Sequence, residues 1–112
     1  MSAIEEEPHA ASDAVDLTRT FQALANGDRL ALLRALLLQD VEDGPARSIA
    51  GLAAQTELSR FSASRHLSIL HDAGVVVVRR SGHRKLHYLN LRHFTHLEDW
   101  LYPFVDAESP LR

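Results

Sequence analysis

The feature that most constrains the fold of this chain is the stretch Leu58–Gly74, LSRFSASRHLSILHDAG, which can bury only one side of a helix. Ser59 stands just before the helical pattern and is a preferred N-cap residue. Ala63, Leu67 and Leu70 recur at helical spacing, so they share one face and are expected to point into a core. Gly74 suits the left-handed position that ends many helices. The stretch therefore predicts an amphipathic helix that presents its other face outward.

That other face is narrow, basic and rich in small hydroxyl side chains. Arginine can bond bidentately to guanine, serine can bond to phosphates or base edges, and small residues let a helix approach closely. These properties suit a helix that reads the DNA major groove, although a merely solvated face is also polar. We therefore predict DNA contacts from this helix at Ser59, Arg60, Phe61, Ser62, Ser64, Arg65, His66 and Ser68.

Three shorter helical patterns precede this helix. The first opens at Asp13 or Asp16 and ends near Leu24, and the second runs from Asp28 to about Gln39. The second pattern places Leu30, Leu33 and Leu37 on one face. A third, short helix follows the potential N-cap Ser48, with Ile49, Leu52 and Ala53 as its buried positions. A tight turn at residues 56–58 then leads into the amphipathic helix, which is helix-turn-helix spacing.

A β-hairpin and a last helix follow. Val75–Arg80 and Lys85–Asn90 read as strands about a turn at Ser81–Arg84. The last helix runs from Leu91 to about Tyr102, and Pro103 is expected to end or kink it. The predicted fold class is mainly α with a small β-hairpin, a winged helix-turn-helix of about five helices plus a two-stranded wing. The hairpin could be a lid over the core, but its basic tip favours a wing that contacts DNA through Arg79, Arg80, His83, Arg84 and Lys85.

The charge of the chain is divided along its length. The net charge is −3, yet residues 1–43 hold nine acidic and three basic residues, and residues 60–93 hold one acidic and seven basic residues. Positive charge confined to the amphipathic helix and the hairpin is the pattern expected of a polyanion-binding surface, with the acidic remainder facing away.

We expect a flexible acidic tail at 1–12, one domain at 13–106 and a short C-terminal tail at 107–112. The two terminal helices carry more apolar surface than a short helix can cover alone, so another subunit is a reasonable partner. The absence of cysteine excludes thiolate metal sites, and the absence of a secretory or membrane-spanning segment leaves a cytoplasmic location and no membrane partner as the expectation. The predicted dimer interface comprises Val15, Leu17, Phe21, Phe94, Leu97, Trp100, Leu101 and Phe104.

Three segments together resemble the ArsR/SmtB family of bacterial winged helix-turn-helix repressors: Leu24–Leu30, Leu58–Leu67 and Leu70–Val76. The following Arg79–Arg84 resembles the wing of that family, and the resemblance covers roughly residues 17–102. It implies a homodimer, built mainly from the first and last helices, that binds double-stranded operator DNA and usually represses. Because a dimer is two-fold symmetric, we expect the operator to be an inverted repeat. Glu57 and Phe61 depart from the family pattern, since glycine and a small polar residue are common there.

The resemblance also raises a metal-responsive alternative. Family members commonly release DNA on binding a metal, and His93 and His96 have the spacing of half a zinc or nickel site. The other half is absent, because Asn90-Leu91-Arg92 stands where an Asp-x-His pair would be needed, so we predict no metal and no cofactor. The sequence does not identify an inducer.

Two further classes of function, an enzyme and a protein-binding module, have some support in the sequence. Ser62, Ser64 and His66 could begin a nucleophilic site, but no orienting acid or oxyanion loop accompanies them, so we expect no enzyme activity. A winged-helix module that binds protein is the better rival, because this fold serves both purposes. Such a module would not need the basic strip of Arg60, Arg65, Arg84 and Lys85.

Overall fold

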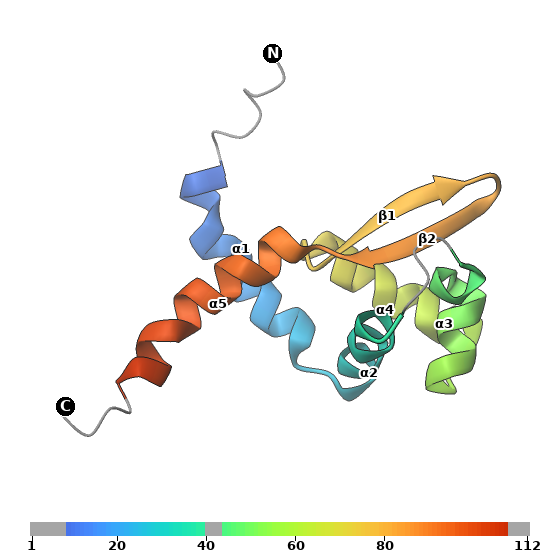
Figure 1. The fold of residues 1–112 in the computed structure, drawn as a ribbon, viewed down its shortest axis with the longest axis horizontal. Coiled ribbons are helices and arrows are strands. Elements are labelled where there is room, and N and C mark those ends of the chain that lie inside the picture. The colour runs from blue at the N-terminus through green and yellow to red at the C-terminus, as the bar shows by residue number, and fades with distance from the viewer. Residues whose placement is uncertain (1–8, 40–43, 108–112) are drawn as a thin grey trace, which may run out of the picture.

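The structure, a computed structural model, describes residues 9–39 and 44–107. Over these residues the order is α1 (His9–Leu24), α2 (Gly27–Leu37), a 3₁₀ turn (Pro45–Arg47), α3 (Ile49–Thr56), α4 (Arg60–Asp72), β1 (Val76–Ser81), β2 (Arg84–Leu89) and α5 (Leu91–Asp106) (Figure 1). Five helices and an antiparallel two-stranded hairpin confirm the predicted winged helix-turn-helix fold. Residues 1–8 and 108–112 of the two predicted tails lie outside the described residues, and the division into tails and domain stays a prediction.

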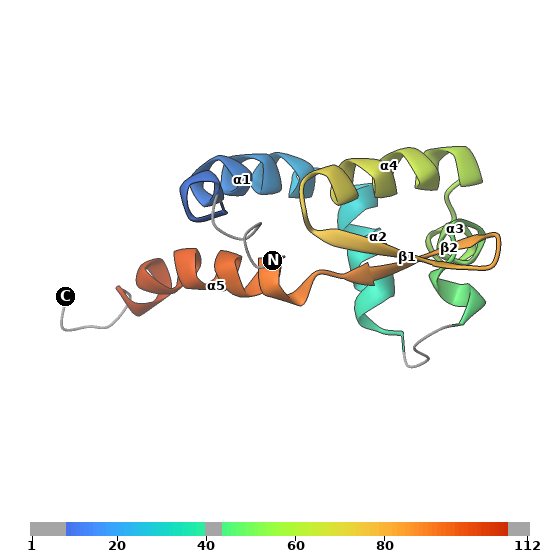
Figure 2. The same cartoon turned by 90° about the horizontal axis from the view of Figure 1, so that it is seen from above.

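Helices α2, α3 and α4 pack with the hairpin into a body, whereas α1 and α5 extend together from one side of it (Figures 1 and 2). The core of the body is formed by leucines of the three helices and by valines that enter β1. Each fully buried leucine stabilises the fold by about 1.5–3 kcal/mol. The least exposed of these side chains are Leu32, Leu52, Leu67, Leu70, Val75 and Val76.

Side-chain caps fix where three helices begin. Asn26, Ser48 and Ser59 each accept a hydrogen bond from the backbone N–H three residues later, at the starts of α2, α3 and α4. Such a bond satisfies one of the donors left without a partner in the first turn. The predicted caps Ser48 and Ser59 are thereby confirmed, together with the turn between α3 and α4.

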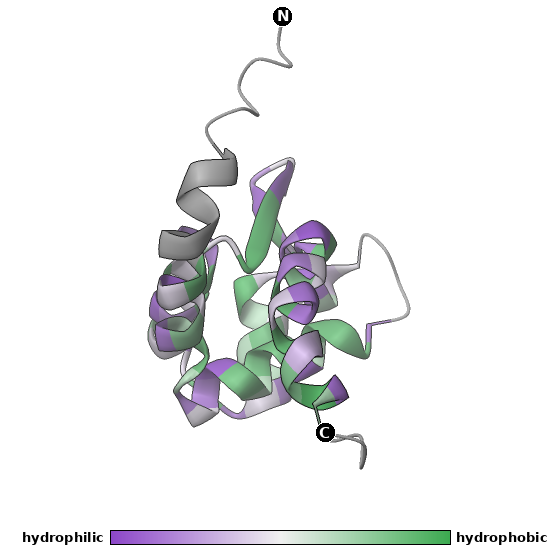
Figure 3. Ribbon diagram, turned by 90° about the vertical axis from the view of Figure 1, so that its left-hand side faces the viewer, coloured by the Kyte–Doolittle hydropathy of each residue, from purple (hydrophilic) through white to green (hydrophobic). Residues whose placement is uncertain are grey.

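The hairpin is tight and its register is set by glycine. Ser81 pairs with Arg84, so only Gly82 and His83 form the turn, and Gly82 has a φ of 64°. Positive φ at a two-residue hairpin turn favours glycine because it has no Cβ. Figure 3 shows the hairpin hydrophobic at its base and hydrophilic toward its tip. At the base, the Asn90 side chain donates to the carbonyl oxygen of Gly74 at 2.8 Å and so joins α5 to the end of α4.

Two predicted details of α1 and α2 were wrong. Helix α1 begins at His9 rather than at Asp13 or Asp16, since the alanines that precede Asp13 are strong helix formers and need no cap. In α2 the buried leucines are Leu32, Leu33 and Leu36, whereas Leu30 and Leu37 are 48% and 65% exposed. A leucine-rich helix offers two apolar stripes, and the packing of α3 and α4 selects which one is buried.

The last helix ends at neither Tyr102 nor Pro103. Helix α5 continues to Asp106 with Pro103 inside it, and the carbonyl oxygen of Pro103 accepts from the N–H of Ala107 at 3.0 Å. Proline removes one backbone donor from a helix but keeps its acceptor, so an exposed last turn can persist. No helix in the described part of the chain is long and apolar enough to cross a membrane.

The turn between α3 and α4 generates a stability prediction. Glu57 has a φ of 63°, which is the left-handed region, and it is the only non-glycine residue there among those described. A side chain in this region costs about 1–2 kcal/mol that glycine does not pay. Glu57→Gly is expected to raise the free energy of unfolding by about 0.5–1 kcal/mol in urea titrations. Glu57→Ala, which loses the same carboxylate but keeps a Cβ, should not; an equal gain in both variants would assign the effect to charge.

Candidate nucleic-acid interface

The exposed face of α4 is set by what its opposite face buries. Ala63, Leu67 and Leu70 are at most 1% exposed and hold the helix on the core. Phe61, in contrast, is 73% exposed, and the Arg65 guanidinium lies 6.0 Å from the centre of its ring. The residues that the fold turns outward together on this helix are Ser59, Arg60, Phe61, Ser64, Arg65 and Ser68.

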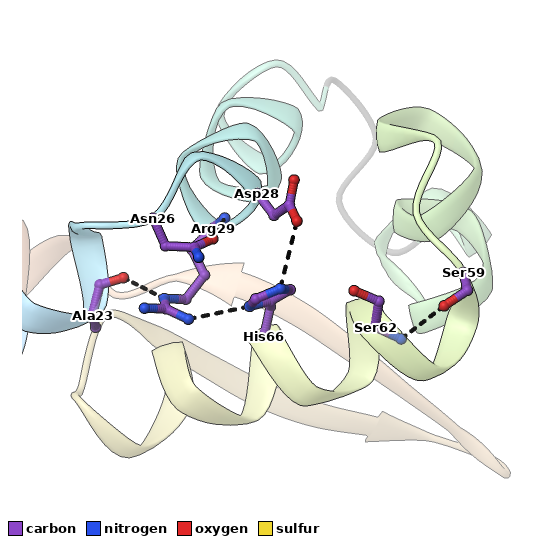
Figure 4. A network of polar contacts seen from close by, with 7 residues as sticks. All are labelled: Ala23, Asn26, Asp28, Arg29, Ser59, Ser62 and His66. Carbon is purple, nitrogen blue, oxygen red and sulfur yellow. Dashed lines mark hydrogen bonds and ion pairs between the residues drawn. The ribbon is translucent and has the colours of Figure 1, made fainter.

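Ser62 and His66 were predicted to contact DNA from the same helix, and the structure leaves both half-buried. The backbone N–H of Ser62 donates to Oγ of Ser59 at 3.0 Å and completes the cap of α4. His66 turns toward α2, where Arg29 and Asp28 lie on either side of its ring (Figure 4). The direct DNA contacts of Ser62 and His66 stay a prediction. What the geometry shows is a contact within the chain, through the backbone of Ser62 and through the ring of His66.

Arg29 and His66 form a polar connection between three helices. The Nη1 of Arg29 lies 3.2 Å from Nδ1 of His66, and the Nε of Arg29 donates to the carbonyl oxygen of Ala23 near the end of α1. Because a guanidinium only donates, Nδ1 must accept, so the proton of neutral His66 is on Nε2, 3.7 Å from a carboxylate oxygen of Asp28. This also leaves no free imidazole nitrogen to activate Ser62 or Ser64, so the arrangement does not support nucleophilic catalysis.

The wing presents the predicted basic residues to solvent. Arg79, Arg80, His83, Arg84 and Lys85 are all exposed, and the last four line a recess of about 350 Å³. The other wall of this recess is the start of α3, at residues 48–50. The first backbone N–H groups of a helix attract anions, and the neighbouring cations add to this attraction. The part that the start of α3 plays in this recess was not predicted from the sequence, although the Ser48 cap marks where the helix begins.

A second polar connection fixes the base of the wing. Arg47 donates to the carbonyl oxygen of His87 at 3.1 Å, and Nδ1 of His87 bonds the carbonyl oxygen of Arg47 at 3.0 Å. The Tyr88 ring is contacted by two guanidinium groups, with its centre 4.4 Å from Cζ of Arg47 and 4.6 Å from Cζ of Arg79. Arg79 is therefore partly occupied within the chain. Nothing in the local sequence pattern identified Arg47 or His87 as buried.

The predicted dimer face divides into two parts. Phe21 of α1 stacks edge-on against Trp100 at 5.3 Å, and Trp100 contacts Phe104 at 4.8 Å, so this part holds α1 and α5 of one chain together. The other part is an apolar groove of about 670 Å³ along α5. It is lined by Leu91, Phe94, Thr95, Leu97, Glu98, Leu101, Tyr102 and Val105. Leu97 is only 8% exposed and contributes to this second part. The side chain of Val15 lies outside the described residues, and Leu17 is half-buried.

The histidines of the metal-responsive alternative do not converge on a site. Nε2 of His93 is 2.6 Å from Oγ1 of Thr20, and its ring packs against Gly74, where a Cβ would come within 3.1 Å. A ring nitrogen in a hydrogen bond with a hydroxyl is not available to a metal without rearrangement. In residues 9–39 and 44–107, no three histidine, aspartate or glutamate residues are grouped as metal ligands.

The fold and this exposed basic face define a winged helix-turn-helix protein. Residues 24–79 match a family model described as a helix-turn-helix domain, and the chain belongs to that family. No curated protein sequence matches it.

Solved structures with the same fold cover almost the whole chain. The homodimeric winged helix-turn-helix domain of a possible ArsR-family regulator from Mycobacterium bovis is 24% identical, with a TM-score of 0.66 over 96% of this chain and 94% of that one. An ArsR-like transcriptional regulator from Rhodococcus sp. RHA1 is 24% identical, with a TM-score of 0.67 over 85% and 83%. The repressor BigR from Xylella fastidiosa is 21% identical, with a TM-score of 0.58 over 93% and 96%. The resemblance to ArsR-family regulators is thereby confirmed.

The buried His87 generates a pH prediction. Burial lowers the pKa of His87 from its ordinary value of 6.5, and the positive charges of Lys85 and His71 lower it further against the opposing backbone hydrogen bond. As pH falls below about 6.5 the unfolded chain takes up this proton before the folded chain does, so stability is lost. His87→Asn, which keeps a neutral donor, should flatten the fall in unfolding free energy between about pH 7 and pH 5.

His83→Asn is the matched control for this measurement, because His83 lies exposed at the wing tip. Urea titrations of the three proteins at each pH provide the comparison. A His87→Asn protein that loses stability with falling pH as steeply as the wild type would show that another group carries the dependence.

Proposed function

We propose that the protein is a homodimeric transcriptional repressor that binds double-stranded operator DNA. The observation that carries this proposal is the exposed face of α4, where Arg60, Phe61, Ser64 and Arg65 project from a helix whose other side is locked into the core. A rigid helix with arginine and small hydroxyl residues on its free side fits the major groove. Ser68 extends this face, and Ser59 secures the start of the helix.

Different parts of the surface take different roles in this proposal. Arg65 and Arg60 read base edges, and the exposed Phe61 packs against a thymine methyl group. Arg84, Lys85 and His83 at the wing tip, with Arg80 behind them, contact the phosphate backbone. The recess between the wing and the start of α3 accepts a phosphate, since the first residues of this helix and the cations of the wing line it together. Backbone contacts set the position of the protein, and base contacts set its preference for sequence.

A second copy of the chain completes the binding surface. The apolar groove of α5 leaves Leu101, Tyr102 and Val105 exposed, and isologous contact between two such faces would cover them. The stack of Phe21 on Trp100 joins α1 and α5 within one chain, so we propose that the two helices enter the interface as one arm. A two-fold dimer reads an inverted repeat, with half-sites about one helical turn or more apart. The dimeric M. bovis domain supports this assembly, and the repressor BigR supports the direction of regulation.

The first test of this proposal separates base reading from backbone contact. Arg65→Ala is expected to cost about 1–3 kcal/mol on the operator and less on random DNA. Lys85→Ala should weaken both complexes similarly and reduce the slope of log K against log salt by about one. Fluorescence anisotropy with the DNA upstream of the protein's own gene, and with a shuffled sequence of equal length, measures both.

Arg34→Ala is the control, because Arg34 is an exposed cation of α2 that is not part of the α4 face or the wing. It should leave both affinities unchanged. Equal losses on operator and random DNA for Arg65→Ala would remove its reading role.

The second test concerns the dimer. Leu101 is 39% exposed and lines the α5 groove, so Leu101→Asp places a charge in the proposed interface without disturbing the core of one chain. Sedimentation velocity should show self-association weakened about tenfold or more, with weaker operator binding. Leu38→Asp makes the same change at a side chain that is 71% exposed near the end of α2 and should have no effect. A Leu101→Asp protein that dimerises like the wild type would place the interface elsewhere.

A further inference from the structure

A second apolar groove lies on the side of α2, apart from the α4 face and the wing. It has a volume of about 600 Å³, which is in the range of small-molecule sites. Leu24 closes one end, Leu30, Leu33 and Leu37 of α2 form the floor, and Leu89, Leu91 and Phe94 form the wall where the hairpin passes into α5.

One positively charged residue, Arg34, lies among these apolar side chains. Among the described residues, Arg34 is the only charged one that lines the groove, and no other described side chain forms an ion pair with it. An exposed guanidinium at the edge of an apolar surface can bind a carboxylate through two parallel hydrogen bonds.

The exposure of the α2 leucines gives the groove an energetic reason to be occupied. Leu30 and Leu37 are 48% and 65% exposed, although they stand on a helix whose other stripe is fully buried. Apolar surface removed from water contributes about 25 cal/mol per Å², so a hydrocarbon chain laid along these leucines is stabilised in proportion to its length.

We infer that this groove binds an amphipathic carboxylate, with its hydrocarbon chain on the leucines of α2 and its acid group on Arg34. The occupant follows from the pattern of the lining, because a single cation beside an otherwise apolar surface matches a molecule with one anionic end. Every residue used belongs to one chain, and the groove shares only Leu91 and Phe94 with the α5 groove of the proposed dimer. The bound molecule contacts both α2 and the junction of β2 with α5.

Isothermal titration calorimetry with decanoate and decanol tests the inference, because the two probes share a chain and differ in the charged end. Decanoate should bind once per chain and about tenfold more tightly than decanol. Arg34→Gln should lower the affinity for decanoate to that for decanol and leave decanol unchanged. Arg19→Gln, the same substitution at an exposed arginine of α1 that does not line the groove, should leave both unchanged.

Leu37→Ser should weaken both probes, because it removes hydrocarbon from the floor while leaving the cation in place. Equal binding of decanoate and decanol to the wild type, or decanoate binding that Arg34→Gln leaves unchanged, would overturn the inference. So would decanoate binding that disappears as the protein self-associates at higher concentration, because the groove would then be covered by a second copy of the chain.

Discussion

The burial of one side of α4 is the interaction on which the rest of the structure depends. Leu67 and Leu70 enter the common core with leucines of α2 and α3, and Ala63 lets the helices approach closely. Because the helix is held by three positions on one face, its free face has a fixed direction. The cations of that face are therefore pre-organised, and binding a polyanion does not have to order them.

Hydrophobic packing holds each helix and strand against the core but does not fix its angle to its neighbours. Two polar connections between elements constrain these angles. Arg29 links the end of α1 and the start of α2 to His66 of α4, and Arg47 links the turn before α3 to His87 of the wing. Each uses an arginine, whose several donors in a rigid plane can satisfy groups on different elements at once. Arginine therefore serves two purposes in this chain. Arg29 and Arg47 stabilise the fold through contacts within it, whereas the exposed arginines are available to a partner.

The apolar residues of the two terminal helices serve more than one purpose. Part of this surface, around Trp100, joins α1 to α5 within the chain, and part, around Leu101, is the surface that we propose a second copy covers. A third part faces α2 beside Arg34. These surfaces adjoin at Leu91 and Phe94, so the arm formed by α1 and α5 is continuous with the body on its apolar side.

The sequence by itself determined the elements, the caps Ser48 and Ser59, and the outward face of α4, because these follow from local periodicity and capping chemistry. The family resemblance marked Glu57 as standing where glycine is common, and its φ of 63° lies in the left-handed region. Only the tertiary structure decided which leucine stripe of α2 is buried, since both stripes are apolar and neighbouring helices choose between them. It also turned His66 inward and buried His87, because their partners, Arg29 and Arg47, lie 37 and 40 residues away and no local pattern reports such a contact.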